Sequence, residues 1–216
     1  MNHQLSSEII SITSGAMQLP GWCTPEKALH IAETVIAEKP RLVVEVGVFG
    51  GRSFLPMVLA LEHIGGQGFA VGLDAWSNAA ATEGMDLHDA DDKKHVEYWG
   101  KMDLASIMAK VGGYIEQRRL WHRCALIQGR SNEVFRIFQP FAIDLLHIDG
   151  NHTELASCRD VRTWLPLVRP GGAVFFDDTN WPSTQAALRL LEMDCKLEAT
   201  RSPTPGTEYR LYRKNA

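Results

Sequence analysis

Short apolar runs alternate with amphipathic stretches along most of this chain. Runs rich in aliphatic and β-branched residues predict strands at 42–46, 68–76, 124–129, 143–150 and 170–178, the last of which begins with a turn. Apolar residues at helical spacing predict helices at 25–38, 53–63, 131–138, 153–168 and 183–193. This alternation is typical of a mostly parallel sheet with helices on both faces. Two further runs, at 195–200 and 207–213, predict an antiparallel hairpin at a sheet edge.

Boundary signals and polar stretches divide the chain further. Thr24 can cap the helix at 25–38, and Pro25 fits its first position. Residues 77–120 are polar and charged, and so long an excursion between strands is more often functional than accidental. We therefore expect one domain over 1–216, with the following parts: an N-terminal helical segment at 1–39 and a helical insertion or lid at 77–120.

Composition limits the classes of function. Hydrophobic residues make up 45% of the 216 residues, which is enough for the core of one α/β domain. The net charge of −4 favours neither nucleic acid nor a membrane surface as a partner. No apolar stretch approaches the roughly 18 residues of a membrane span, and the first residues do not resemble a signal peptide. Reduced thiols in a cytoplasmic protein are expected, because no CxxC pair occurs among Cys23, Cys124, Cys158 and Cys195.

Acidic residues occur where the predicted strands end. In an open α/β sheet, the carboxyl ends of the strands form the ligand crevice. Aspartate is also a common turn residue, so a solvated turn remains the alternative for each acid taken alone. Their number along one rim favours a ligand site, and the acids concerned are Glu45, Asp74, Asp149, Asp177 and Asp178.

The first strand runs directly into a glycine turn. In VVEVGVFGGRS (43–53), the residues Gly47, Gly50 and Gly51 allow a ligand to approach the backbone closely. The turn lacks the lysine of a phosphate-binding loop, and Phe49 interrupts the Gly-x-Gly of a dinucleotide motif. An acid just before the turn would repel a pyrophosphate. It suits instead a cationic ligand that carries an amino group.

Four segments carry a resemblance to a known family: VVEVGVFGGRS, GLDAW (72–76), LLHIDGNH (145–152) and VRPGGAVFFDD (168–178). They resemble the class I S-adenosylmethionine (SAM)-dependent methyltransferases. More narrowly, they resemble metal-dependent O-methyltransferases of the catechol and macrolide-sugar type. The resemblance covers about residues 40 to 180. It implies a Rossmann-like, doubly wound, seven-stranded sheet and methyl transfer to a hydroxyl of a phenol, a sugar or a natural-product intermediate.

The resemblance also implies contacts with the cofactor. Glu45 and the glycine turn would hold the methionine portion, Asp74 the ribose hydroxyls, and Trp76 would flank the adenine. Asp74 ends the second strand, where a ribose-binding acid belongs in a nucleotide-type half-fold. Ser131 would line the same pocket. The complete expected cofactor-binding set is Glu45, Gly47, Phe49, Gly50, Gly51, Ser53, Asp74, Trp76, Ser131 and Asp149.

A second group of acids predicts a metal site. The chain between Asp149 and Asp177 is long enough for a helical crossover, so both strand ends can face one point. With Asp178 they would supply hard oxygen ligands, which suit Mg²⁺ or another divalent cation such as Ca²⁺ or Mn²⁺. The resembling family uses such a metal to orient substrate oxygens. The alternative is that Asp178 only caps the following turn.

His152 is the candidate general base, with Asp149 as its catalytic partner. It stands where catechol-type relatives carry a proton-accepting lysine, and an imidazole pKa near neutrality suits that role. A helix N-terminus at this point would disfavour the protonated imidazole. The alternative is that NHTE (151–154) merely begins a helix, with Asn151 as the cap. His147 lies inside an apolar strand and is expected to be a core or supporting residue.

Two other classes of function stay open. His147 and Asp149 imitate the His-x-Asp pair of a non-haem iron oxygenase, although such enzymes usually have a β-barrel. A nucleotide-binding module without chemistry is the other alternative, and the convergent acids argue against it. The expected partner is a small-molecule hydroxyl acceptor, with neither nucleic acid nor membrane. A homodimer is left open.

Overall fold

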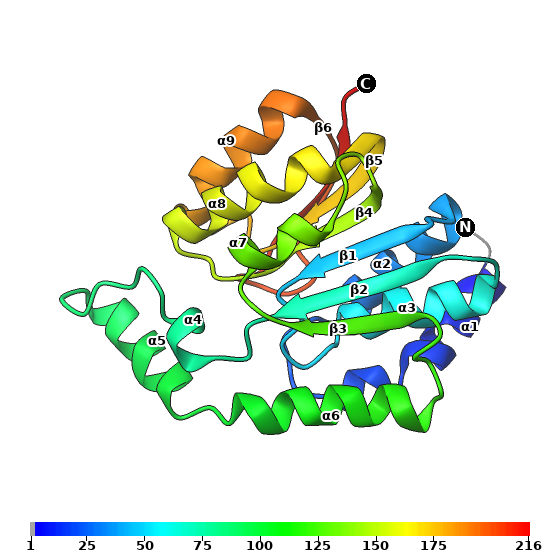
Figure 1. The fold of residues 1–216 in the computed structure, drawn as a ribbon, viewed down its shortest axis with the longest axis horizontal. Coiled ribbons are helices and arrows are strands. Elements are labelled where there is room, and N and C mark those ends of the chain that lie inside the picture. Colours follow the sequence, from blue (N-terminus) through cyan, green and yellow to red (C-terminus); the bar gives the residue numbers. More distant parts are fainter. Residues whose placement is uncertain (1–2) are drawn as a thin grey trace.

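The computed structural model describes residues 3–216 and contains a seven-stranded sheet between two layers of helices (Figure 1). The strands are β1 (Leu42–Val46), β2 (Phe69–Asp74), β3 (Cys124–Gln128), β4 (Ile143–Ile148), β5 (Val168–Phe176), β6 (Cys195–Arg201) and β7 (Tyr209–Lys214). Their order across the sheet is β3-β2-β1-β4-β5-β7-β6. Strands β1 to β5 pair in parallel, whereas β7 is antiparallel to both β5 and β6. The predicted α/β class, sheet and C-terminal hairpin are confirmed.

The helices divide between the two faces of the sheet. They are α1 (His3–Thr13), α2 (Pro25–Glu38), α3 (Phe54–Ile64), α4 (Asn78–Ala81), α5 (Ala90–Gly100), α6 (Leu104–Gln117), α7 (Ser131–Val134), α8 (Glu154–Trp164) and α9 (Gln185–Asp194). Helices α1, α2, α3 and α6 pack on the face that presents Val43, Leu145 and Phe175. Helices α8 and α9 pack on the opposite face. Because successive strand residues point to opposite faces, each inner strand is apolar on both sides.

Local chemistry explains where several elements begin and end. Thr24 accepts a hydrogen bond from the backbone N–H of Lys27 at 3.2 Å, and Pro25 is the first residue of α2, as predicted. Helix α8 ends at Trp164 and a 3₁₀ turn (Leu165–Leu167) follows, because a proline in that turn cannot continue the helix. The expected helix at 153–168 is therefore shorter. The expected turn near Gly171 lies within β5, at an irregularity of its pairing with β4.

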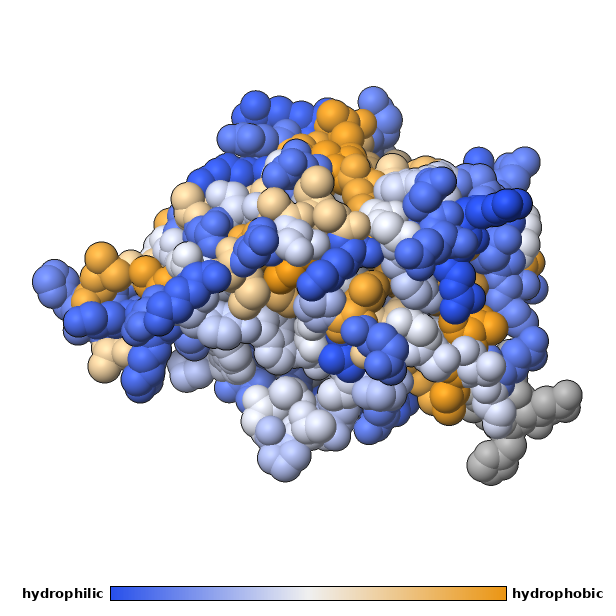
Figure 2. Space-filling view, turned by 90° about the horizontal axis from the view of Figure 1, so that it is seen from below, coloured by the Kyte–Doolittle hydropathy of each residue, from blue (hydrophilic) through white to orange (hydrophobic). Residues whose placement is uncertain are grey.

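Residues 77–120 form helices α4, α5 and α6. Figure 1 shows α4 and α5 beyond the carboxyl ends of β1 and β2, while α6 runs alongside the sheet. The apolar side of α6 joins the core through Ile107, Val111 and Ile115. The face seen in Figure 2 is largely hydrophilic, with separate small hydrophobic patches. Within residues 3–216, none of the helices has the length and apolar character that crossing a bilayer requires.

Candidate active site

A cavity of about 860 Å³ opens at the carboxyl ends of the central strands. Its walls include the residues at or just after the ends of β1, β2, β4 and β5. Strand β1 pairs with β2 on one side and with β4 on the other, so the cavity lies where the strand order reverses. This switch point is the usual ligand site of an open α/β sheet. The volume is within the range of small-molecule pockets.

The glycine turn after β1 forms one wall of the cavity. A side chain at Gly47 would place its Cβ 1.9 Å from the backbone oxygen of Asp149, and the residue has a φ of +94°. At Gly50 a Cβ would lie 2.0 Å from the backbone oxygen of Pro20. Both glycines are therefore required by close backbone approach, and both line the cavity. Ser53 lines it as well.

Asp74 lies at the end of β2 and is held in place by the backbone. One carboxylate oxygen accepts the N–H of Phe49 at 2.8 Å, and the other accepts the N–H of Trp76 at 2.6 Å. Burial raises the pKa of Asp74, while these two backbone N–H groups oppose the rise. Each carboxylate oxygen can accept a further hydrogen bond. Asp74 is therefore a pre-oriented acceptor facing the cavity, as a ribose-binding acid would need to be.

Three residues of the expected cofactor set do not line the cavity. Glu45 is completely buried, because its side chain pairs with His147 behind the wall. Trp76 turns its indole into the core, where its N–H donates to the backbone oxygen of Phe49 at 2.9 Å. Gly51 faces the side chains of Leu55 and Val111. The placements expected for Glu45 beside the methionine, Trp76 beside the adenine and Gly51 at the ligand are thus corrected by the packing.

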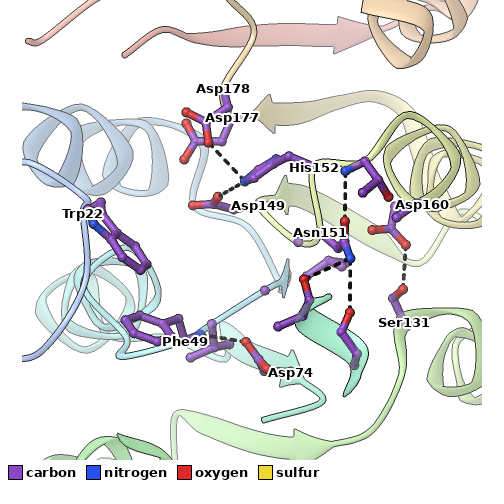
Figure 3. Close-up of a pocket in the computed structure, with 18 of the residues that line it drawn as sticks. Trp22, Phe49, Asp74, Ser131, Asp149, Asn151, His152, Asp160, Asp177 and Asp178 are labelled. Carbon is purple, nitrogen blue, oxygen red and sulfur yellow. Dashed lines mark hydrogen bonds and ion pairs between the residues drawn. The ribbon is translucent and has the colours of Figure 1, made fainter. Parts of the chain in front are cut away.

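The predicted acidic cluster is assembled, but it contains a lysine that was not predicted from the sequence. Asp149 follows β4, and Asp177 and Asp178 follow β5 (Figure 3). The Nζ atom of Lys27, from α2, contacts Asp177 Oδ2 directly and lies 3.4 Å from Asp149 Oδ2. The side chain of Lys27 is only 6% exposed. Two of the three expected metal ligands are therefore paired with a buried ammonium group.

The charges of this cluster depend on one another. Burial opposes the charge of Lys27, but Asp177 and Asp149 outweigh it and hold the lysine pKa well above its usual 10.5. Burial would also raise the pKa of Asp149, yet the Lys27 charge and a hydrogen bond to His152 bring it well below 3.8. For Asp177, burial and the neighbouring Asp149 charge raise the pKa. Asp149 is thus the carboxylate that stays ionised most readily.

His152 lies between two carboxylates, as Figure 3 shows. Its Nε2 atom is 3.1 Å from Asp178 Oδ2 and 3.5 Å from Asp149 Oδ1. Burial lowers the pKa of His152, but these two acids outweigh it and raise the pKa above 6.5. The net shift is therefore opposite in direction to the one expected from the helix N-terminus alone. The N-cap of α8, the helix that follows, is Thr153 rather than Asn151.

A buried pair supports the cluster from behind. Glu45 Oε1 and His147 Nδ1 are 2.7 Å apart, and both side chains are fully buried. The other ring nitrogen of His147 lies 4.0 Å from Asp149 Oδ2. His147 therefore occupies the core position expected from its apolar strand. Glu45 thus fixes the orientation of the His147 ring beside Asp149.

Further polar residues close the opposite side of the cavity. Ser131 lines the cavity as expected, and its hydroxyl donates to Asp160 Oδ1 at 2.6 Å. Asp160 is 3% exposed, and burial raises its pKa to about 6. Asn151 donates to backbone oxygens of the insertion, including that of Ala80 at 3.1 Å and that of Glu83 at 3.0 Å. These contacts tie the insertion to the loop after β4.

Aromatic side chains line the remaining walls. Trp22 stacks on Phe49 with ring centroids 4.9 Å apart, and Trp99 meets both rings edge-on. Trp181 lies edge-on to His152 at 5.3 Å and parallel to His95 at 6.3 Å. Trp22 and Trp181 were not predicted from the sequence, because neither belongs to a motif. Lys27 and Asp160 were missed for the same reason, whereas Asn151 lies within a recognised segment and was expected only as a helix cap.

Comparison with solved structures places the fold among methyltransferases. The O-methyltransferase from Bacillus cereus, solved in complex with SAH, is 16% identical; the match covers 99% of this chain and 92% of that chain, with a TM-score of 0.62. TomG from Streptomyces achromogenes, an O-methyltransferase involved in tomaymycin synthesis and solved with SAM, is 18% identical; the match covers 100% and 92%, with a TM-score of 0.61. The O-methyltransferase NovP is 16% identical; the match covers 99% of each chain, with a TM-score of 0.68. At these identities the likeness establishes the fold.

Sequence comparison then establishes the family. The chain is 26% identical over 147 residues to an uncharacterized protein, y4gI, of Sinorhizobium fredii. That match covers 67% of this chain and 14% of the relative, so the chain spans about a seventh of the length of this curated relative. A family model described as a methyltransferase domain matches residues 44–179, which is more than half of the chain. The expected resemblance to class I SAM-dependent methyltransferases is confirmed, whereas its narrower, metal-dependent part stays a prediction: the chain belongs to this methyltransferase-domain family and has the class I fold.

Proposed function

We propose that this chain is a SAM-dependent O-methyltransferase that acts on a hydroxyl of a small molecule. One observation carries the proposal: a single cavity joins Asp74 to the cluster of His152 with Asp149 and Asp178 across the strand-order switch. The family and the fold support methyl transfer. The two alternatives are disfavoured, because the sheet is not the β-barrel of an iron oxygenase and a pure binding module needs no base beside paired acids.

The cofactor would occupy the side of the cavity at the carboxyl ends of β1 and β2. Asp74 would accept the ribose hydroxyls, and Gly47 and Gly50 would let the methionine portion lie against the turn. The methionine amino group needs an acidic partner, and Asp149 is the candidate because it lines the cavity, whereas Glu45 is sealed behind the wall. The sulfonium methyl would then point towards His152.

The acceptor would occupy the side lined by His152 and the aromatic residues. Its hydroxyl oxygen attacks the sulfonium methyl, so an O–C bond forms as the C–S bond breaks and SAH is released. The Nε2 N–H of His152 faces the carboxylates of Asp149 and Asp178, which orient the ring, so the hydroxyl proton would pass to the other ring nitrogen, Nδ1. Trp22 and Trp181 would cover apolar parts of the acceptor and keep water away from the reacting atoms.

The divalent cation predicted from the sequence fits these residues poorly. Asp149 and Asp177 flank the Lys27 ammonium, which occupies the position between them. Two groups of donor atoms converge within 4.8 Å among the described residues: Glu45, His147 and Asp149 behind the wall, and Asp149, His152 and Asp178 at the cavity. Each group includes an imidazole nitrogen, whereas Mg²⁺ prefers oxygen ligands. No step of the proposed reaction is therefore routed through a metal.

The test separates binding from turnover. Calorimetry with SAM and with SAH should show one binding event per chain. Release of SAH should then be followed over a panel of phenols, sugars and other hydroxyl compounds, with thiol and amine analogues as controls. Binding of neither SAM nor SAH by the folded chain would refute the proposal. Turnover confined to the thiol or amine controls would refute its assignment to a hydroxyl.

A further inference from the structure

Lys27 is buried between Asp149 and Asp177, where the sequence predicted a divalent cation. It is the third residue of α2, and the Thr24 cap fixes the first turn of this helix. Its side chain crosses towards the carboxyl ends of β4 and β5 and lines the cavity. A buried ammonium is costly unless it is paired. This placement therefore needs compensating groups, and the structure supplies them.

The partners of Lys27 come from the ends of three strands. Asp177 Oδ2 is in direct contact with Nζ, and Asp149 Oδ2 lies at 3.4 Å. The ammonium also lies 5.6 Å from the centre of the Tyr209 ring, within the range of a cation–π contact. Together these groups compensate the buried charge. Lys27 is thus an ionic link between the ends of β4 and β5.

A divalent cation between Asp149 and Asp177 would compete for the same space. It would share their oxygens with Lys27 and would meet the ammonium charge at contact distance. Like charges so close, in a buried setting, repel strongly. One of the two cations must therefore leave. The contacts of Lys27 favour the resident side chain.

We propose that Lys27 replaces the divalent cation at Asp149 and Asp177, so that this chain transfers methyl groups without a metal. The inference rests on the proposed function for its catalytic part. Lys27 is a positioning residue that holds both carboxylates in fixed geometry. An ammonium has three N–H donors, and the pairings of Lys27 with Asp149 and Asp177 use two. The third can be donated to an acceptor oxygen in the cavity.

The first measurement needs no substrate. The chain, dialysed against EDTA and saturated with SAH, is titrated with Mn²⁺ and followed by electron paramagnetic resonance. The proposal expects no stoichiometric Mn²⁺ site. It also expects the same turnover before and after EDTA treatment, within twofold. One tightly bound Mn²⁺ per chain, or activity that EDTA abolishes and Mg²⁺ restores, would overturn it.

The second measurement changes Lys27 itself. Lys27→Met keeps the length of the side chain and removes the charge, so Asp149 and Asp177 lose their resident cation. This variant should lose at least tenfold in metal-free turnover and should acquire an Mn²⁺ site. Lys27→Arg should remain independent of metal, and Lys110→Met, on the exposed side of α6, should behave as the unaltered chain. Full metal-free activity in Lys27→Met, or no Mn²⁺ binding by that variant when folded, contradicts the proposal.

The two proposals fail in different ways. If the proposed function is wrong, neither SAM binding nor turnover appears, yet the Mn²⁺ titration of the unaltered chain still decides the role of Lys27. If Lys27→Met does not fold, that titration and the Lys27→Arg variant still decide whether the ammonium replaces a metal. A chain that binds SAM, turns over an acceptor and requires Mg²⁺ would leave the proposed function intact and remove only the inference about Lys27.

Discussion

Asp74 offers the sharpest test of the cofactor site, because its structural and ligand-binding roles can be separated. Both carboxylate oxygens accept backbone N–H groups, from Phe49 and from Trp76. The residue therefore holds the glycine turn whether or not a cofactor binds. Asp74→Asn keeps the shape of the side chain but replaces one acceptor by an NH₂ donor. That donor faces a backbone N–H and cannot pair with it.

The two effects have different sizes. One backbone N–H left without a partner costs about 1–3 kcal/mol of folding free energy. Burial raises the pKa of Asp74, so a neutral side chain also removes a desolvation cost and the net loss should lie near the lower bound. A ribose hydroxyl that donates to a carboxylate contributes about 1.5–3 kcal/mol, and much of this depends on the charge. SAM affinity should therefore fall by about 10- to 100-fold.

Two assays on the same preparations measure the two effects. Urea unfolding gives the loss of stability, and calorimetry with SAM gives the loss of affinity at a temperature where the variant is fully folded. Asp194→Asn, at the exposed end of α9, is the matched control. Lower stability with unchanged SAM affinity would show that Asp74 only supports the turn. The assigned ribose contact would then be wrong.

Other predictions follow from single contacts. His152→Ala should lower turnover by about 10²–10⁴-fold with SAM affinity nearly unchanged, and turnover at the parent rate would assign the proton transfer elsewhere. His152 acts as a base only when it is deprotonated, and its pKa lies above 6.5. Turnover of the unaltered chain should therefore fall as the pH drops through the pKa of His152. Gly50→Ala should cost at least about 2 kcal/mol in urea unfolding, since its Cβ would meet the Pro20 oxygen, whereas Gly113→Ala, in open space, should not destabilise. The pKa of Asp160 is about 6 in the folded chain, against the usual 3.8. Between these two pH values Asp160 is therefore protonated in the folded chain but not in the unfolded chain. Raising the pH from 4 to 6 should therefore cost on the order of 2 kcal/mol of stability that Asp160→Asn does not lose.

The fold was predictable because local and long-range signals agree. The strand at 42–46 and the helix at 25–38 have the predicted bounds, since a β-branched run and a Thr-Pro start leave few alternatives. Errors occur where short-range signals compete. The run at 143–150 suggested a strand through Asp149, whereas β4 ends one residue earlier, at Ile148, although the Asp149 N–H still donates to the Val46 oxygen at 2.8 Å. Near Gly171 the expected turn is instead an irregularity within β5, which pairs with β4 on both sides of it.

The candidate site was only partly predictable. Acids after parallel strands must meet at one edge, so the convergence of Asp149, Asp177 and Asp178 follows from topology alone. Which side of a strand-end residue faces the ligand does not follow, and this is why Glu45 was misplaced. The position of Lys27 depends on how α2 packs beneath β4 and β5. The helical periodicity of residues 25–38 does place Lys27 on the buried side, four residues before Ile31 and eight before Val35, but it does not show which carboxylates pair with the charge.

The raised pKa of His152 bears on how such a site would work. In the proposed reaction, one positive charge leaves the sulfonium and one appears on the imidazole. The total charge in the cavity is therefore constant, but its position moves towards Asp149 and Asp178. Asp149 and Asp178 lower the fraction of His152 that is deprotonated at neutral pH. The same two acids stabilise the imidazolium that forms when His152 accepts the proton. A fixed ammonium at Lys27, unlike an exchangeable cation, would keep this balance independent of the metal content of the solution.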